Sequence, residues 1–282
     1  MKNNPHISFE FFAAKTPEGR EKLKSTCREL DKFSPEFYSV TYGAGGSTRD
    51  TTKDIVLDIQ ADGYAAAPHL SVGGDSQADV IELVQSYKKA GVDKLVALRG
   101  DLPSGIGGTK QLVHANELVA LIRQHSGDHF EINVAAYPEI HPEAESYSKD
   151  VFWLGEKFNA GADRAITQYF YNPDAYFRFI DDCSAAGIDQ PIVPGIMPLT
   201  NYHNLVRFSD NCGADIPRWL RWQLKERSDN PKDLIKYGID VVSKLCEDLL
   251  AGGAPGLHFY TMNQWQISDT LCRNLGLPAK AL

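Results

Sequence analysis

Short apolar runs alternate with longer amphipathic segments along the whole chain. The runs are rich in β-branched and aromatic residues and begin near His6, Phe37, Ala65, Lys94, Phe130, Arg164, Gln190 and Gly256. Several are almost continuously apolar or small, which is typical of parallel strands that are covered on both faces. The pattern therefore predicts eight strands.

The segments between the runs have helical periodicity. One ends before Gly91 and repeats apolar residues at i, i+3, i+4 and i+7, namely Val80, Leu83, Val84 and Tyr87. Another combines an N-cap and a first-turn proline at Asn172-Pro173 with a stop at Gly187. A third opens at Pro231 and carries one apolar stripe, Ile235, Ile239, Val242, Cys246 and Leu249.

Strand followed by helix, eight times over, is the pattern of a (β/α)₈ (TIM) barrel of the α/β class. Strand starts are about 30 residues apart, but the gap between Gln190 and Gly256 is roughly twice as long. Residues 216–222, within this longer gap, predict an extra helix between strands seven and eight. Because no linker-like stretch interrupts the chain, we expect residues 1–282 to form a single domain. An open, doubly wound sheet is the alternative, since the number of strands does not exclude it.

Composition narrows the class of function. The chain has 29 Lys and Arg against 37 Asp and Glu, a net charge of −8, which argues against a general nucleic-acid binder. The sequence shows neither a signal-peptide pattern nor a long uncharged apolar stretch. It therefore gives no indication of a secreted or membrane protein. The five cysteines are scattered, without a CxxC pair, and indicate reduced thiols. We expect a soluble cytoplasmic protein.

Barrel active sites lie where the strands end and the following loops begin. Polar residues at these positions are Glu10, Thr41, Tyr42, His69, Arg99, Asp101, Tyr137, His141, Gln168 and Asn263. If the odd-numbered residues of the first strand pack against helices, Glu10 faces the barrel interior. A carboxyl in such an apolar setting has a raised pKa and suits general acid catalysis. The alternative is an outward-facing Glu10 paired with a lysine or arginine.

Other motifs are less specific. Arg99-Gly100-Asp101 fits an anion clamp, and equally a structural salt bridge at the rim. The glycine-rich turn at residues 43–48 has Thr48 where a dinucleotide fingerprint needs its third glycine, which disfavours a Rossmann site, although its backbone N–H groups remain available to a phosphate. His141-Pro142-Glu143 lacks HExxH spacing, so we expect no metal centre.

Seven segments occur in the order of the motifs of a known family: residues 8–12 (SFEFF), 40–44 (VTYGA), 67–69 (APH), 97–101 (ALRGD), 136–143 (AYPEIHPE), 164–168 (RAITQ) and 258–261 (HFYT). The chain resembles methylenetetrahydrofolate reductases, and its length resembles the bacterial form without a regulatory domain. The resemblance implies FAD at the mouth of a barrel. It also implies reduction of 5,10-methylenetetrahydrofolate to 5-methyltetrahydrofolate, with electrons from NADH or NADPH in a ping-pong mechanism. The product would supply one-carbon units to methionine synthesis. Relatives form dimers or tetramers, so we expect a homo-oligomer, with Trp219 and Trp222 as candidate contacts.

The resemblance also implies roles for single residues. Glu10 matches the general acid, Asp101 the carboxylate near flavin and pterin, and Thr41 a residue beside the reactive edge of the flavin. Cofactor-binding positions are Thr41, Tyr42, Ala44, His69, Arg99, Gly100, Asp101, Ala115, Tyr137, His141, Ala144, Asp150 and Lys157. Substrate-binding positions are Gln168, Asn204, Phe208 and Gln264.

The chain departs from the family pattern at several of these places. Asn204 replaces a folate-binding glutamine, and Gln264 replaces an arginine implicated in holding the glutamate tail of the folate. Trp153 and Glu156 stand where some bacterial relatives have asparagine and arginine, so contacts with the adenosine end of FAD are expected to differ.

Three other functions remain open. They are an FAD barrel of the proline-dehydrogenase type, a flavin-free barrel such as an aldolase or a pterin-binding methyltransferase, and an inactive folate- or flavin-binding protein. The joint presence of Glu10, Asp101 and Gln168 disfavours the last of these.

Overall fold

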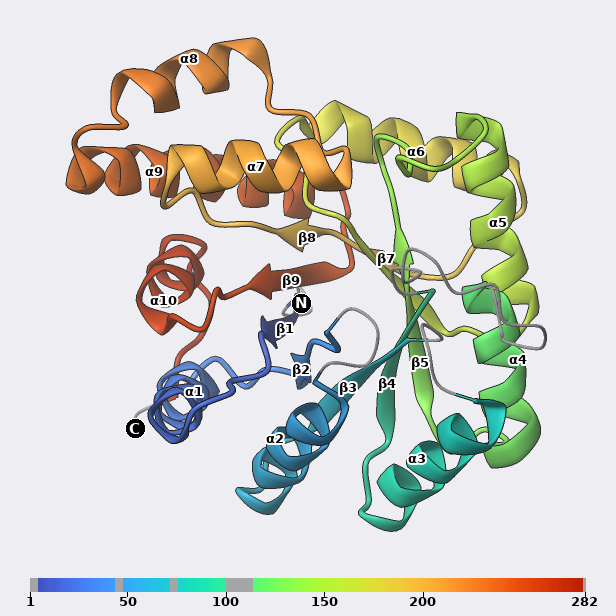
Figure 1. The fold of residues 1–282 in the computed structure, drawn as a ribbon. Coiled ribbons are helices and arrows are strands. Elements are labelled where there is room, and N and C mark those ends of the chain that lie inside the picture. Colours follow the sequence, from blue (N-terminus) through green and yellow to red (C-terminus); the bar gives the residue numbers. More distant parts are fainter. Residues whose placement is uncertain (1–4, 44–47, 72–75, 100–113, 281–282) are drawn as a thin grey trace.

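The fold is a barrel of parallel strands surrounded by helices (Figure 1). It is seen in a computed structural model that describes residues 5–43, 48–71, 76–99 and 114–280. The strands are β1 (His6–Phe11), β2 (Phe37–Val40), β3 (Ala66–Ser71), β4 (Lys94–Leu98), β5 (Glu131–Ala136), β6 (Arg164–Thr167), β7 (Ile192–Val193), β8 (Gly195–Ile196) and β9 (Gly256–Tyr260). Every expected strand is present.

The seventh expected strand is split in two at a proline. β7 pairs with β6, whereas β8 pairs with β9, and only Pro194 separates β7 from β8. A proline has no N–H to donate to a sheet, but its carbonyl accepts a hydrogen bond from the His258 N–H at 3.0 Å. Since β9 also pairs with β1, the two ends of the sheet meet in a nearly closed barrel. The barrel prediction is confirmed, and the open doubly wound sheet is excluded.

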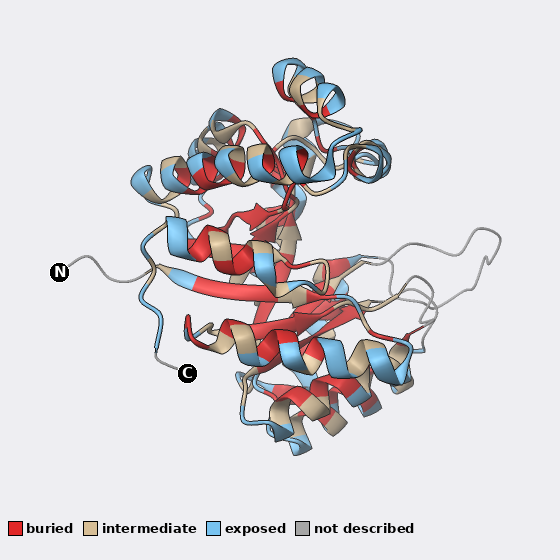
Figure 2. Cartoon of the chain, turned by 90° about the vertical axis from the view of Figure 1, so that its left-hand side faces the viewer, coloured by how far each residue is buried: buried red, intermediate tan, exposed pale blue. Residues whose placement is uncertain are grey.

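Helices surround the barrel and bury one face each. They are α1 (Pro17–Asp31), α2 (Arg49–Ala61), α3 (Gln77–Lys89), α4 (Ala115–Ser126), α5 (Tyr147–Asn159), α6 (Pro173–Ala185), α7 (Tyr202–Cys212), α8 (Arg218–Glu226), α9 (Pro231–Ala251) and α10 (Trp265–Asn274). Figure 2 shows the buried strands in red at the centre and exposed outer helix faces in blue. None of the helices in the described part of the chain has the length and apolar content that a membrane span requires.

The sequence patterns for the helices are confirmed at their ends and only partly along their faces. All four apolar residues of the α3 stripe are buried. The Asn172 side chain caps α6 by accepting a hydrogen bond from the Asp174 N–H. In α9 the expected stripe is wrong in its first half, where Leu234 is buried and Ile235 is only half-buried. The reason is a close backbone approach, because a Cβ on Gly238 would lie 2.5 Å from Leu199 O.

The long segment between β8 and β9 holds more helix than expected. The predicted extra helix is α8, which starts at Arg218 rather than Ile216, but α7 and the long α9 occupy the same segment. In Figure 1 these three helices lie together beyond one side of the barrel.

Substitution of Gly195 tests the barrel closure. A Cβ here would overlap Thr167 O and lie 2.6 Å from Tyr260 Oη, so we expect Gly195→Ala to lower the free energy of unfolding by about 1–3 kcal/mol. Gly155→Ala is the control. Gly155 lies inside helix α5, and a Cβ there would be 3.6 Å from Ile188 Cδ1, an ordinary van der Waals contact. Urea denaturation measures both. Equal stability of the two variants would contradict the tight packing at the split strand.

Candidate active site at the mouth of the barrel

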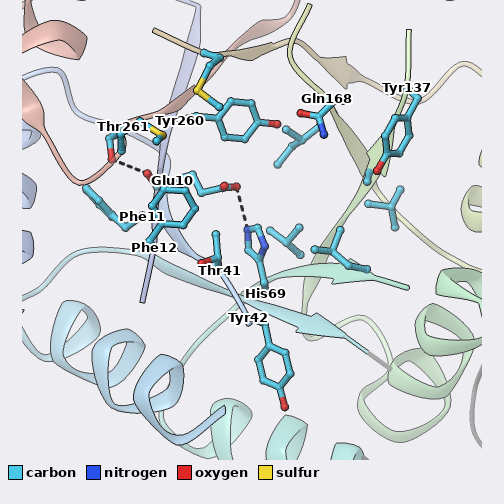
Figure 3. A pocket seen from close by; sticks show the side chains of 17 residues that line it. Glu10, Phe11, Phe12, Thr41, Tyr42, His69, Tyr137, Gln168, Tyr260 and Thr261 are labelled. Carbon is cyan, nitrogen blue, oxygen red and sulfur yellow. Dashed lines mark hydrogen bonds and ion pairs between the residues drawn. The ribbon is translucent and has the colours of Figure 1, made fainter. Parts of the chain in front are cut away.

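A cavity of about 320 Å³ lies at the carboxyl ends of the strands. Its polar wall comes from six strand ends and includes Glu10, Thr41, Tyr42, His69, Tyr137 and Gln168 (Figure 3). Apolar side chains from the strands and from the segments after them form the rest of the wall, among them Phe12, Val96, Leu98, Ile166 and Met197. The cavity therefore combines a mostly apolar surface with a few converging polar groups, as ligand sites do.

A second cavity of about 560 Å³ continues from the first. The two share Tyr42, Leu98, Ala135 and Tyr137. Its remaining wall comes from the end of β4, the start of α4, the loop after β5, and α5. Together the cavities form an elongated site that runs from the barrel mouth to the two helices.

Strand alternation directs Glu10 into the mouth. Phe9 and Phe11 are fully buried and stack against Tyr38 on the other face of the strand. The Glu10 backbone is held by Thr261, whose Oγ1 donates to Glu10 O at 2.7 Å. The expected inward orientation of Glu10 is confirmed, and the alternative of an outward pairing with lysine or arginine is wrong.

Two imidazoles contact the same carboxylate oxygen. Glu10 Oε2 lies 3.2 Å from His69 Nε2 and 3.3 Å from His258 Nε2. At its other nitrogen, His258 Nδ1 is 2.7 Å from the Ser8 hydroxyl. A carboxylate, two imidazoles and a hydroxyl thus form one polar chain in the barrel interior.

These imidazoles overturn the expected pKa of Glu10. Burial by itself raises the pKa of the carboxyl, but the charge of His69 and hydrogen bonding from both imidazoles outweigh it and lower the pKa to about 2. Sequence alternation identified the apolar setting of Glu10 and did not identify the partners inside it. Glu10 is therefore ionised at neutral pH.

Tyr260 lies beside Glu10 on the neighbouring strand β9 and lines the same cavity. Its hydroxyl donates to Thr167 O at 2.7 Å, and burial raises its pKa well above the ordinary value, with the Glu10 charge adding to the effect. Gln168 follows Thr167 in the chain. Its Oε1 accepts a hydrogen bond from the Tyr169 N–H at 3.0 Å, and its side chain lines the cavity. Gln168 thus accepts a hydrogen bond from the backbone and also faces the site.

The second cavity has a charged wall that is largely paired. Lys157 Nζ donates to Ala135 O at 2.6 Å, and burial lowers its pKa to about 8 against the opposing charge of Asp150. The same Asp150 accepts a hydrogen bond from the His141 N–H at 2.7 Å. Arg99 forms an ion pair with Glu143. The adjacent Asp101 lies outside the described residues.

Comparison with known proteins identifies the family. The sequence model for methylenetetrahydrofolate reductase matches residues 1–276. The 5,10-methylenetetrahydrofolate reductase of Pectobacterium carotovorum is 40% identical over 273 residues, which cover 96% of this chain and 90% of that protein. The Escherichia coli enzyme of the same name is 38% identical, with 96% and 91% covered. This chain belongs to the methylenetetrahydrofolate reductase family.

Solved structures support the barrel at much lower identity. An uncharacterised protein from Clostridium thermocellum, which binds two copies of 5-methyl-5,6,7,8-tetrahydrofolic acid, superposes with a TM-score of 0.66 at 16% identity and covers 97% of this chain and 95% of its own. Oxaloacetate acetylhydrolase superposes with a TM-score of 0.52 at 12% identity, covering 99% of this chain and 85% of its own. These two structures bear on the fold alone.

Most residues that the reductase family resemblance assigned to cofactor binding line the two cavities. They are Thr41, Tyr42, His69, Arg99, Ala115, Tyr137, His141, Ala144, Asp150 and Lys157. Three further expected positions, Ala44, Gly100 and Asp101, lie outside the described residues. The cofactor roles of all these residues stay predictions.

Three expected substrate-binding residues do not lie on the cavity walls. Asn204 and Phe208 are on α7, where Asn204 is exposed and Phe208 is half-buried beneath the Arg207 guanidinium. Gln264 is exposed at the N-cap of α10. Only Gln168 of this group is in the first cavity, so the other three lie away from the described cavities in the ligand-free chain.

Sequence reasoning gave His258 no role of its own. The signal was present, because β1 and β9 pair in parallel with Ser8 opposite His258 and Glu10 opposite Tyr260. Side chains at matching positions on neighbouring strands face the same side of a sheet. Once the first and last strands are known to be neighbours, the interior position of His258 follows from that of Glu10.

Glu139 links the loop after β5 to the end of α7. Its Oε2 accepts a hydrogen bond from the Asp215 N–H at 2.8 Å. Burial raises the pKa of Glu139 from 4.5 to about 7; this hydrogen bond opposes the rise and the Asp215 charge adds to it. The link holds the segment that carries Tyr137 and His141 to the second cavity.

Glu139 makes the stability of this link depend on pH. Between pH 4.5 and about 7 the folded state binds more protons at Glu139 than the unfolded state does, so the contribution of this residue to stability falls as pH rises through that window. We expect Glu139→Gln to raise the melting temperature relative to the unmodified protein more at pH 8 than at pH 5. Glu145→Gln, on the same loop but exposed, is the control. A Glu139→Gln effect that is the same at both pH values would contradict this assignment.

Proposed function

We propose that this chain is an FAD-dependent methylenetetrahydrofolate reductase. It reduces 5,10-methylenetetrahydrofolate to 5-methyltetrahydrofolate with electrons from NADH or NADPH, in a ping-pong mechanism at one mouth. Family membership supports the reaction. The observation that carries the mechanism is the Glu10 carboxylate at the mouth, largely shielded from solvent and in contact with two imidazoles.

The residues present fit a flavin dinucleotide. The first cavity offers mostly apolar walls for a flat ring system, and the second continues it towards two helices. His69 Nε2, at the edge of the first cavity, contacts Glu10 Oε2 at 3.2 Å and has no further hydrogen-bond partner in the part of the chain that is described.

The charge distribution supports the same placement. The wall of the second cavity carries Lys149 and Lys157, and it includes Ala115 and Asn116, the first two residues of α4. Backbone N–H groups at a helix N-terminus favour anions. The linking phosphates of a dinucleotide would therefore lie near α4, with Thr41 and Tyr42 beside the ring system.

The chemistry divides between cofactor and protein. When bound, FAD would take electrons from the nicotinamide nucleotide and supply them to the folate. The folate must first open its five-membered ring, which requires a proton on the departing nitrogen. Glu10 is placed to deliver that proton, and Gln168 on the facing wall is placed to orient the folate or the nicotinamide.

The proton for this step can pass through three neighbouring side chains. His69 and His258 both contact one oxygen of Glu10, so the carboxyl and the imidazoles lie within reach of one another for proton transfer. A folate that displaces water from the mouth weakens solvation of the carboxylate and favours its protonated form. Ser8 fixes the orientation of His258 through Nδ1.

Other expectations remain part of this proposal. Asp101 would stabilise positive charge on the pterin, and Ala44 and Gly100 would contact the cofactor. A homo-oligomer is proposed on the family resemblance. Its candidate contact residues Trp219 and Trp222 are 54% and 61% exposed on α8.

Replacement of Glu10 separates the two half-reactions. We expect Glu10→Gln to leave flavin reduction by NADH or NADPH within about twofold, and to slow folate reduction by roughly 10²–10⁴-fold, the usual contribution of a general acid. Anaerobic stopped-flow absorbance of the flavin measures each half-reaction in turn. Circular dichroism shows whether the variant is folded, and Glu82→Gln, at an exposed position on α3 that lines neither cavity, serves as the control. Equal losses in both half-reactions would remove Glu10 from the acid role.

The same preparation tests the alternatives. A purified protein that stays colourless after FAD is added would favour a flavin-free barrel, and oxidation of proline without any response to methylenetetrahydrofolate would favour the proline-dehydrogenase type. Flavin or folate binding without turnover would indicate an inactive binding protein.

A further inference from the structure

Two aromatic rings stand parallel at the wall of the second cavity. His114, at the N-cap of α4, and Trp153, on α5, have ring centroids 5.3 Å apart and planes inclined by 16°. Both side chains line the cavity. We call this pair the aromatic platform.

The platform is not part of the hydrophobic core. α5 buries Val151, Leu154 and Phe158 against the barrel, whereas Trp153 remains 43% exposed. A tryptophan gains much free energy when it is covered, so a half-exposed indole with one face already stacked at a cavity wall is suited to receive a ligand ring.

We propose that the aromatic platform binds the purine ring of the dinucleotide, so that this chain selects FAD over FMN by ring stacking. This inference rests on the proposed function. A ring between His114 and Trp153 would need about 7 Å, twice the contact distance of carbon atoms, which exceeds the observed 5.3 Å. The purine therefore stacks on an outer face of the pair.

The groups beside the platform match the rest of such a ligand. Lys149 and the first residues of α4 line the same cavity and suit phosphate oxygens. Of the three carboxylates on this wall, Glu143 is paired with Arg99 and Asp150 accepts the His141 N–H. Glu145 remains exposed beside them.

Glu156, further along α5, does not contribute a polar contact at this end of the site. It does not line the cavity, and its Oε1 accepts a hydrogen bond from Asn159 Nδ2 at 3.0 Å. Recognition at this end of the site therefore depends on stacking at Trp153.

Flavin titrations of the apoprotein test this inference. We would remove the flavin from the purified protein and measure Kd for FAD and FMN by quenching of flavin fluorescence. For Trp153→Asn we expect FAD affinity to fall about tenfold or more, as when a base loses an aromatic partner, and FMN affinity to change less than twofold. Trp153→Phe should keep most of the FAD affinity.

Trp222→Asn is the matched control. Trp222 is an exposed tryptophan on α8 and lines neither cavity, so both affinities should be unchanged. As an independent readout, ADP should quench tryptophan emission in the unmodified apoprotein, and this quenching should be lost in Trp153→Phe.

The outcomes are distinguishable. If Trp153→Asn weakens FAD and FMN equally, the residue is structural and the inference is overturned. It is equally overturned if FAD affinity does not change while the unmodified protein binds FAD. If the unmodified apoprotein binds neither flavin, the proposed cofactor fails first and the platform with it.

Discussion

The site depends on the parallel pairing of the first and last strands of the barrel. Residues 248 positions apart in the chain, Glu10 and His258, come within 3.3 Å because β1 and β9 are neighbours in register. A slip by one residue would turn every interior side chain of one strand towards the helices. The buried aromatic layer behind β1, where Phe9 stacks on Phe259 and Tyr38, opposes such a slip.

Competition between burial and charge determines the chemistry at Glu10. Burial alone raises the pKa of the carboxyl, whereas the charge of His69 and hydrogen bonding from both imidazoles lower it. A ligand that covers the mouth removes water from the carboxylate and strengthens the effect of burial. The barrel wall therefore sets the acid strength of Glu10 as well as its position.

The elongated cavity explains how one mouth is proposed to serve two substrates in turn. Its inner part adjoins Glu10 and Gln168, whereas its outer part runs along α4 and α5. A cofactor anchored in the outer part would leave the inner part free for successive ligands. The split strand at Pro194 contributes to this geometry, because Gly195 lets Tyr260 approach Thr167 closely beside the inner cavity.

Local patterns in the sequence determined the strands, most helix ends and the inward direction of Glu10, because strand alternation and helix capping depend on neighbouring residues. The seven motif segments indicated the protein family. Tertiary structure alone decided that the seventh strand is split at Pro194, that His258 adjoins Glu10 and lowers its pKa, and that Trp153 stacks on His114. Each of these results joins residues from separate elements, and no local periodicity encodes which side chains then meet.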